Sequence, residues 1–124
     1  MNFTGISDCE LLVMKCLWTA EQPISVHVLI TELDKQYGKK YKETTVYTFL
    51  SNLRKKMYVD SYKKGASYFY PLVSEDDYVK QYAQIMRSFW GDRALSVLID
   101  SMIFPEGSSP EGKAQIERLL EHGN

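Results

Sequence analysis

Long apolar runs and cysteines are both scarce in this 124-residue sequence. No stretch approaches the ~20 apolar residues needed to span a bilayer, and the first residues show no basic region followed by an apolar run. We therefore expect a cytoplasmic protein with no membrane partner. The two cysteines, Cys9 and Cys16, lie about two turns apart on one predicted helix, too far for a mutual disulfide. They are expected to be small core residues in a reducing compartment.

Residue types that carry catalysis and metal binding are also few and scattered. The two histidines, His27 and His122, have no Cys, Asp or Glu at ligand spacing, so we expect no metal site. The seven glycines are spread through predicted turns and form no phosphate-binding loop. Asp76 and Asp77 lie at a predicted helix start, where the helix dipole explains them. The sequence therefore predicts no enzyme and no cofactor.

Positive charge, by contrast, is concentrated in one segment. Eight of the fifteen Lys and Arg residues lie between Lys39 and Lys64 with only two acidic residues, so this segment carries +6 while the whole chain carries −1. Such a field suits a polyanion, because neutralising phosphates releases condensed counterions. The pattern favours nucleic acid as a partner, and a solvated lysine face is the simpler alternative.

Local capping signals predict two helices in the first 38 residues. Ser7 and Glu10 form a capping box for a first helix that runs to about Trp18. Ser25 is the expected N-cap of a second helix, and Gly38 its C-cap. Both helices have apolar residues at helical spacing, which predicts one buried face on each.

A third predicted helix has two contrasting faces. It starts near Glu43 or Thr44 and runs to about Met57. The apolar residues that recur at helical spacing, and are expected to be buried, are Val46, Phe49, Leu50, Leu53 and Met57. The opposite face carries short hydrogen-bonding side chains in place of the Glu, Lys and Ala usual on a solvent-exposed helix.

That polar face is typical of a helix that reads the major groove of DNA. Asn52 can pair bidentately with adenine, and threonine methyl groups can contact thymine. No arginine projects from the row to read guanine, so we expect an A/T-leaning site. The residues predicted to read bases are Thr44, Tyr47, Thr48, Ser51 and Asn52.

A β-hairpin with a basic tip is predicted after the third helix. Its arms span residues 59–62 and 67–72, and Lys63, Lys64 and Gly65 form the tip. Three helices followed by such a wing predict a mainly α fold with a small β-hairpin wing, the winged form of helix-turn-helix. The residues expected to contact phosphate are Ser25, Lys42, Arg54, Lys55, Lys56, Lys63 and Lys64.

Beyond residue 73 the pattern changes to apolar helices. Ser74 is expected to cap a fourth helix, and Gly91 and Asp92 are expected to break it. A fifth helix should follow, and then a short last helix after a hinge near residues 105–110. We expect residues 1–73 to be a DNA-binding head and residues 74–124 a C-terminal helical dimerisation arm, because a major-groove reader with two-fold symmetry needs two heads ~34 Å apart. An intramolecular helical subdomain is the alternative. The residues predicted to make the dimer are Tyr82, Phe89, Leu95, Leu98, Ile99 and Met102.

Several motifs carry a family resemblance along nearly the whole chain. They are residues 6–10 with 13–18 (ISDCE and VMKCLW), residues 45–50 with 53–56 (TVYTFL and LRKK), and residues 70–73 (YPLV). In these motifs the chain resembles the BlaI/MecI-type penicillinase repressors. The resemblance implies a winged-helix transcriptional repressor that binds an inverted-repeat operator in double-stranded DNA as a homodimer.

The sequence also departs from the family pattern. Thr44, Tyr47 and Asn52 stand where the family tends to have Lys, a basic residue and Arg, and Met57 replaces the usual glycine. The resemblance further implies inactivation by cleavage of an Asn-Phe bond in the fifth helix, but residues 98–102 read LIDSM. The operator sequence, target genes, inducing signal and any upstream sensor or protease cannot be read from the sequence. A winged-helix protein-protein interaction module remains the alternative function.

Overall fold

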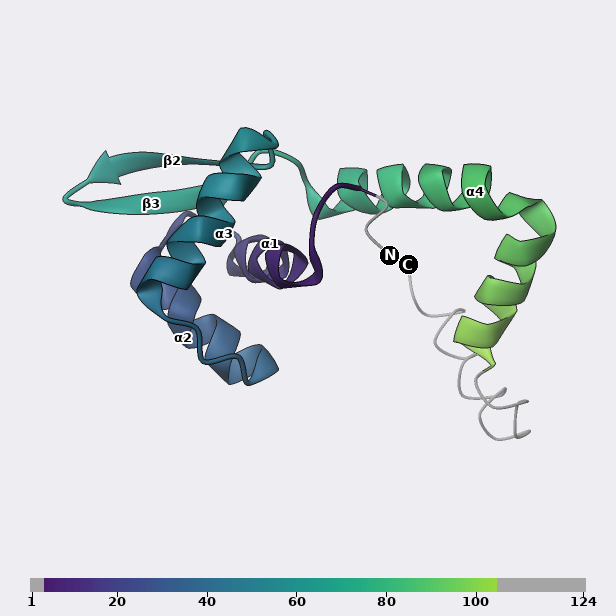
Figure 1. Cartoon of the computed structure of the whole chain (residues 1–124), viewed down its shortest axis with the longest axis horizontal. Coiled ribbons are helices and arrows are strands. Elements are labelled where there is room, and N and C mark those ends of the chain that lie inside the picture. Colours follow the sequence, from purple (N-terminus) through teal and green to yellow (C-terminus); the bar gives the residue numbers. More distant parts are fainter. Residues whose placement is uncertain (1–3, 105–124) are drawn as a thin grey trace. The chain divides into compact units, whose positions relative to one another are not determined.

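The computed structural model describes residues 4–104, which form helices and one small sheet (Figure 1). In chain order the elements are α1 (Asp8–Ala20), β1 (Ile24–Ser25), α2 (Val26–Tyr37), α3 (Glu43–Lys55), β2 (Val59–Lys64), β3 (Ala66–Pro71) and α4 (Glu75–Ile103). The last helix predicted from the sequence lies outside the described residues.

The predicted caps of α1 and α2 are confirmed. Ser7 Oγ accepts a hydrogen bond from the backbone N–H of Glu10 at 3.2 Å, and Glu10 Oε1 accepts one from the N–H of Ser7 at 2.9 Å. Ser25 caps α2, and Gly38 ends it in the left-handed region with φ +66°. These pairs are local in sequence, which is why the sequence alone was sufficient to place them.

The end of α3 differs from the prediction. The helix stops at Lys55, and Met57 takes a left-handed φ of +66°. The N–H of Tyr58 donates to the carbonyl of Leu53 at 2.9 Å, and the N–H of Met57 donates to the carbonyl of Arg54 at 3.0 Å. This is the pattern of a Schellman cap. The prediction that Met57 is buried is wrong, since the cap turns its side chain out and leaves it 70% exposed.

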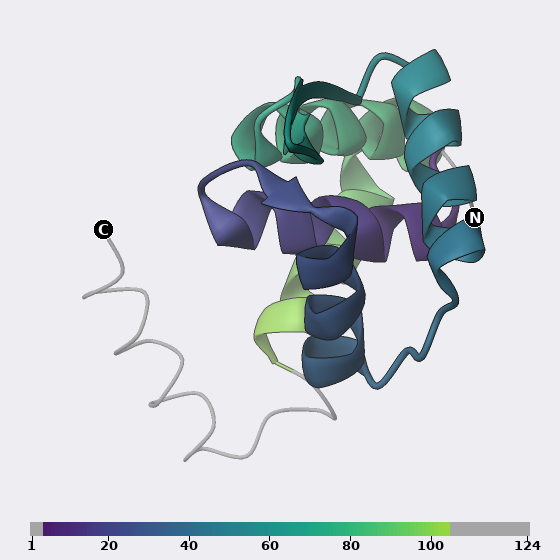
Figure 2. The same cartoon turned by 90° about the vertical axis from the view of Figure 1, so that its left-hand side faces the viewer.

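The sheet contains the predicted hairpin and one strand that the sequence did not reveal. Strands β2 and β3 are antiparallel around Gly65, and β1 joins the far side of β3 to give the order β1-β3-β2. Phe69 of β3 pairs with both Ile24 and Ser61. Figure 2 shows the hairpin nearly end-on, beside the helices. The two-stranded wing expected from the sequence is thus part of a three-stranded sheet.

The chain divides into two compact units after Tyr82. We call the described residues 4–82 the first unit and residues 83–104 the second unit. The core of the first unit is made by residues from α1, α2, α3, the sheet and the start of α4: Ile6, Val13, Met14, Cys16, Leu17, Ile24, Val26, Leu29, Leu33, Val46, Leu50, Leu53, Tyr58, Val59, Phe69 and Tyr78. This division follows packing, so the assignment of residues 1–73 to DNA binding and 74–124 to dimerisation stays a prediction.

The start of α4 belongs to the first unit because Tyr78 is anchored there. Its hydroxyl lies 2.8 Å from Thr4 Oγ1, and its ring centroid lies 5.4 Å from that of Trp18. Trp18 in turn donates from Nε1 to the carbonyl of Val73 at 2.9 Å. The first turns of α4 therefore close the core beside α1. Ser74 caps this helix as predicted, accepting from the N–H of Asp77.

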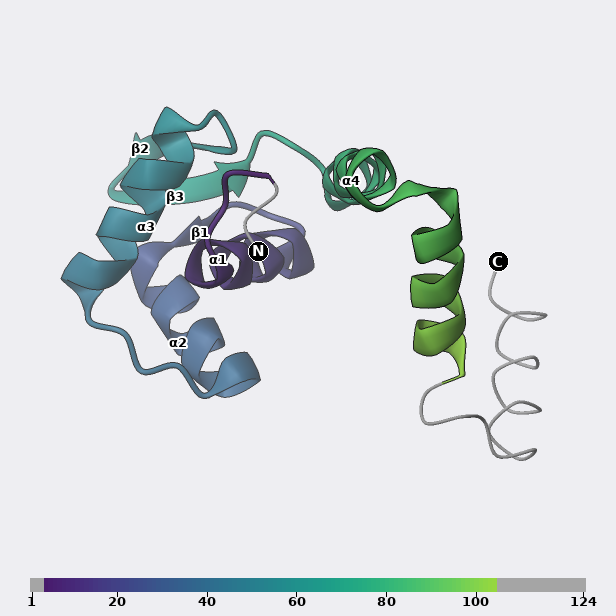
Figure 3. The same cartoon turned by 45° about the vertical axis from the view of Figure 1, so that its right-hand side comes forward.

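A break within α4 lies inside the second unit. Gly91 has φ +81° and ψ 169°, which is not helical, so two helical segments meet there as the sequence predicted. Figure 3 shows α4 changing direction along its length. Arg87 Nε lies 2.9 Å from Asp92 Oδ1 and bridges the break. Only a glycine adopts this backbone conformation without strain.

Candidate nucleic-acid interface

The helix α3 presents a polar face opposite its buried one. Val46, Leu50 and Leu53 are buried in the core. At the helical spacing, Thr44, Thr48, Ser51 and Lys55 lie on the far side of α3, and all four are exposed. The Thr48 hydroxyl donates to the carbonyl of Thr44 at 3.0 Å, so its methyl group and its oxygen, as an acceptor, remain to contact a partner.

Two other predicted base-reading residues lie on opposite edges of this face. Tyr47 is exposed on the side of the wing, where its ring meets that of Phe69 edge-on at 6.3 Å. Asn52 lies on the other edge and is half-buried. The structure therefore brings all five predicted reading residues to the outer half of one helix, with Thr44, Thr48 and Ser51 at its centre.

Arg54, predicted as a phosphate contact, lies between α3 and the wing. Its guanidinium donates to Ser61 Oγ, its Nε lies 3.8 Å from Asp60 Oδ1, and it covers the ring of Phe69 at 5.9 Å. The side chain is still 51% exposed. A cation held by three neighbours in this way is oriented before any partner arrives.

Lys56, also predicted as a phosphate contact, is already paired within the fold. Its Nζ lies 2.7 Å from Oε1 of Glu10, which is only 3% exposed. Burial alone would raise the pKa of Glu10, but the hydrogen bonds from Lys56 and the Ser7 N–H outweigh it and hold this pKa below its usual value. The pair joins the end of α3 to the start of α1.

The remaining predicted phosphate contacts occupy four places. Lys42 precedes α3 and Lys55 lies in its last turn, and both are exposed. Lys63 and Lys64 are exposed near the hairpin tip, and strand alternation places them on opposite faces of the wing. Ser25 accepts from the N–H of Val28 as the cap of α2. Its hydroxyl is therefore engaged at a helix N-terminus, a common location for a phosphate contact.

Sequence reasoning missed Ser61, Ser67 and Phe69 as parts of this surface. The strand register Ser61↔Phe69 and Lys63↔Ser67 places them on the face of the hairpin that meets α3. Alternation along 59–71 was a usable signal for which residues share a face. It could not show which face meets the helix, because that depends on packing.

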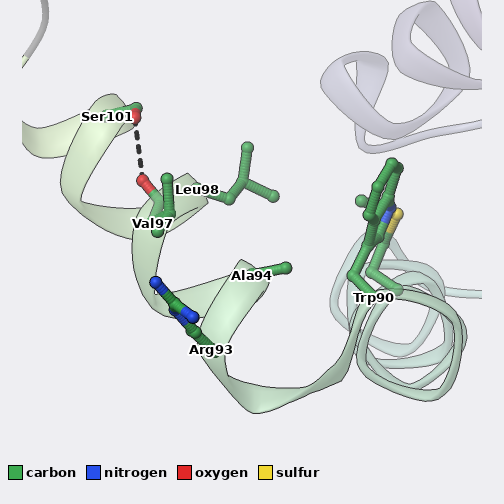
Figure 4. Close-up of a pocket in the computed structure, with 7 residues that line it drawn as sticks. Trp90, Arg93, Ala94, Val97, Leu98 and Ser101 are labelled. Carbon is green, nitrogen blue, oxygen red and sulfur yellow. Dashed lines mark hydrogen bonds between the residues drawn. The ribbon is translucent and has the colours of Figure 1, made fainter.

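The predicted dimerisation residues are mostly exposed. Phe89, Leu98, Ile99 and Met102 are exposed on the second unit, Tyr82 is exposed on the first turns of α4, and Leu95 is half-buried. The second unit also holds an apolar pocket of about 610 Å³ at the Gly91 break. Trp90 from one segment and Ala94 and Leu98 from the next face this space (Figure 4).

Both cysteines are free and lie in the first unit. Burial raises the pKa of the Cys16 thiol to about 11, so it is protonated at neutral pH. Cys9 is half-buried, and its Sγ accepts a hydrogen bond from the Tyr41 hydroxyl at 3.2 Å. Within residues 4–104, no group of three or more His, Cys, Asp or Glu side chains could hold a metal ion. No helix in this range is long and apolar enough to cross a membrane.

Comparison with known proteins gives a family. A search of curated proteins found no match. Two solved structures are each 35% identical, with a TM-score of 0.49 over 59% of this chain and 87% of the other: the DNA-binding domain of the repressor BlaI, and monomeric BlaI of Bacillus licheniformis in complex with the blaP half-operator. A sequence model described as penicillinase repressor matches residues 6–122. The chain therefore belongs to the penicillinase repressor family of DNA-binding regulators.

Proposed function

We propose that this chain represses transcription by binding, as a homodimer, an A/T-leaning inverted repeat in double-stranded operator DNA. The observation that carries this proposal is the outer face of α3. It presents Thr44, Thr48 and Ser51 to solvent, beside exposed Lys42 and Lys55. A helix that served only solubility would not combine low-propensity polar residues with flanking cations.

The proposal assigns two kinds of contact to the first unit. Thr44, Tyr47, Thr48, Ser51 and Asn52 read base edges in the major groove. The cations around them and at the wing tip contact phosphates, which position the helix but carry no sequence information. These cations are Lys42, Arg54, Lys55, Lys63 and Lys64. The protein acts in the cytoplasm, where the DNA lies, and has no catalytic role.

The homodimer is proposed from the second unit. Its exposed apolar side chains include Phe89, Leu98, Ile99 and Met102. A second copy of the same surface would cover them and would hold two reading helices on one face of the DNA. Two-fold symmetry of the protein then requires an inverted repeat with half-sites about one helical turn, ~34 Å, apart.

Selection from a random double-stranded DNA library at moderate salt tests the proposal directly. We expect enrichment of an A/T-leaning inverted repeat. Recovery of nothing above background would overturn DNA reading and favour a winged-helix module that binds another protein.

Two variants then separate reading from positioning. Asn52→Ala should relax the sequence preference at one position of each half-site, with a loss of about 1–3 kcal/mol for the preferred base. Lys64→Ala should weaken all duplexes alike and reduce the salt slope by about 1 per head. Unchanged specificity in the Asn52 variant would show that this residue does not read a base.

A further inference from the structure

We propose that the notch between α3 and the wing is a seat for one phosphodiester of the bound DNA, formed by Arg54, Ser61 and Ser67. The inference rests on the proposed function and adds a site to it. The notch has a volume of about 220 Å³. Residues of α3 form one wall, residues of the hairpin form the other, and Phe69 lies between them.

The path of the DNA strand leads to this notch. A recognition helix in the major groove and a wing that reaches the neighbouring minor groove lie on two sides of one sugar-phosphate strand. That strand must therefore pass between α3 and the hairpin. Tyr47 and Ser51 border the notch on the helix side, and Ser61 and Ser67 border it on the wing side.

Arg54 is suited to hold a phosphate there. A guanidinium has five N–H donors, and one of the Arg54 donors is used by Ser61 Oγ. The ring of Phe69 and the carboxylate of Asp60 fix its plane, while about half of the side chain stays exposed. The Asp60 carboxylate, 3.8 Å from Nε, also offsets part of the positive charge. The seat therefore depends on directed hydrogen bonds more than on net charge.

A neutral donor completes the seat. Among the bonds of residues 4–104, none involves the Ser67 hydroxyl, so it can donate to a phosphate oxygen. The register also places Lys63 on the same face of the hairpin as Ser67. On the opposite face, Tyr62 stacks on Tyr68 at 5.7 Å and has no part in the notch.

Single methylphosphonates test the seat, because each replaces one charged phosphate oxygen with a neutral methyl group. They are placed one at a time along a half-site of the duplex recovered by selection, and the dissociation constant is measured for the unmodified protein and for Arg54→Gln. We expect one position at which the modification weakens the unmodified protein about tenfold or more. The same modification should change binding of Arg54→Gln less than about twofold.

Matched variants control the experiment. Ser67→Ala should show a smaller loss of coupling at the same phosphate, whereas Tyr62→Phe, which removes a hydroxyl from the opposite face, should show none. Arg54→Lys, which keeps the charge without the planar fork, should recover only part of the coupling. Thermal unfolding confirms that each variant is folded.

The outcomes separate this inference from the proposed function. If the effects of Arg54→Gln and of every methylphosphonate simply multiply, the notch seats no phosphate and Arg54 only holds the wing against α3. If no duplex of any sequence binds, both the seat and the proposed DNA recognition are overturned.

Discussion

The two units of the chain place similar apolar side chains in opposite environments. In residues 4–82, side chains from six elements and the start of α4 converge on one core, and Val13, Leu29, Leu53 and Val59 have no solvent exposure. In residues 83–104, no residue is fully buried, and Met102 is 73% exposed. Both segments are rich in Leu, Ile, Val and aromatic residues, so composition does not distinguish them.

The difference lies in the number of surfaces that each unit brings together. The first unit packs three helices against a sheet, so each apolar face meets another. The described part of the second unit consists of two helical segments joined at Gly91, which leave apolar faces uncovered. We infer that the first unit is stable as a single chain, and that the second gains its stability from association.

The largest expected effect comes from removing a core side chain in the first unit. Leu53→Ala should lower the free energy of unfolding by about 2–5 kcal/mol, because Leu53 is fully buried and its truncation leaves a cavity in the core. Urea denaturation measures this loss. Leu98→Ala is the matched control and should leave unfolding of the first unit unchanged; an equal loss in both variants would break the contrast between the units.

A charged side chain introduced into the second unit should weaken the proposed dimer. Leu98→Glu should raise the dissociation constant of the homodimer by about tenfold or more, since it would bury an unpaired carboxylate among apolar side chains. Sedimentation equilibrium at micromolar concentration measures it, and Asp100→Ala on the same helical segment is the control. A protein that is monomeric without any substitution would contradict the proposed dimer.

Glu10→Gln should weaken the link between α1 and α3. It removes the charge that pairs with Lys56, and we expect a loss of about 1–3 kcal/mol at pH 7. Since the folded state lowers the pKa of Glu10 from its usual 4.5, the carboxylate stabilises the fold above that pH, and the benefit is lost as pH falls through the folded pKa. The free energy of unfolding of the variant should therefore fall less steeply than that of the unmodified protein as the pH is lowered.

Glu75→Gln is the matched control for that experiment. Glu75 pairs with Lys15 on the surface, where solvent weakens the interaction, so its loss should cost less than about 1 kcal/mol. If both variants lose the same stability, burial does not distinguish the two ion pairs.

The smallest expected effect is a gain in stability. Met57→Gly should stabilise the first unit by about 0.5–1 kcal/mol, because glycine adopts a φ of +66° without strain and the exposed methionine side chain contributes little packing. Met57→Ala keeps the Cβ and should give no such gain. Thermal unfolding of the two variants side by side decides whether backbone strain is stored at this cap.

Features that depend on neighbouring residues could be predicted from the sequence. The capping box of Ser7 and Glu10, the cap at Gly38 and the break at Gly91 each depend on residues a few positions apart. The hairpin tip at Gly65 was also visible, since glycine and two lysines interrupt an aromatic run. The polar face of α3 followed from helical periodicity alone.

The features that escaped prediction join distant parts of the chain. β1 is two residues long and is defined only by its pairing with β3. Glu10 and Lys56 lie 46 positions apart, so nothing local showed that this lysine is neutralised. Met57 followed the apolar period of α3, but the Schellman cap ended the helix before that period could apply.

The cap at Met57 also affects the thermodynamics of DNA binding. Between the last residue of α3 and the first of β2 lie only residues 56–58, of which Lys56 is ion-paired and Tyr58 is buried. The connection between helix and wing is thus short and ordered, and docking on DNA requires no loss of chain entropy at this junction. The heat capacity change of DNA binding should accordingly reflect burial of preformed surfaces, without a contribution from folding of the wing.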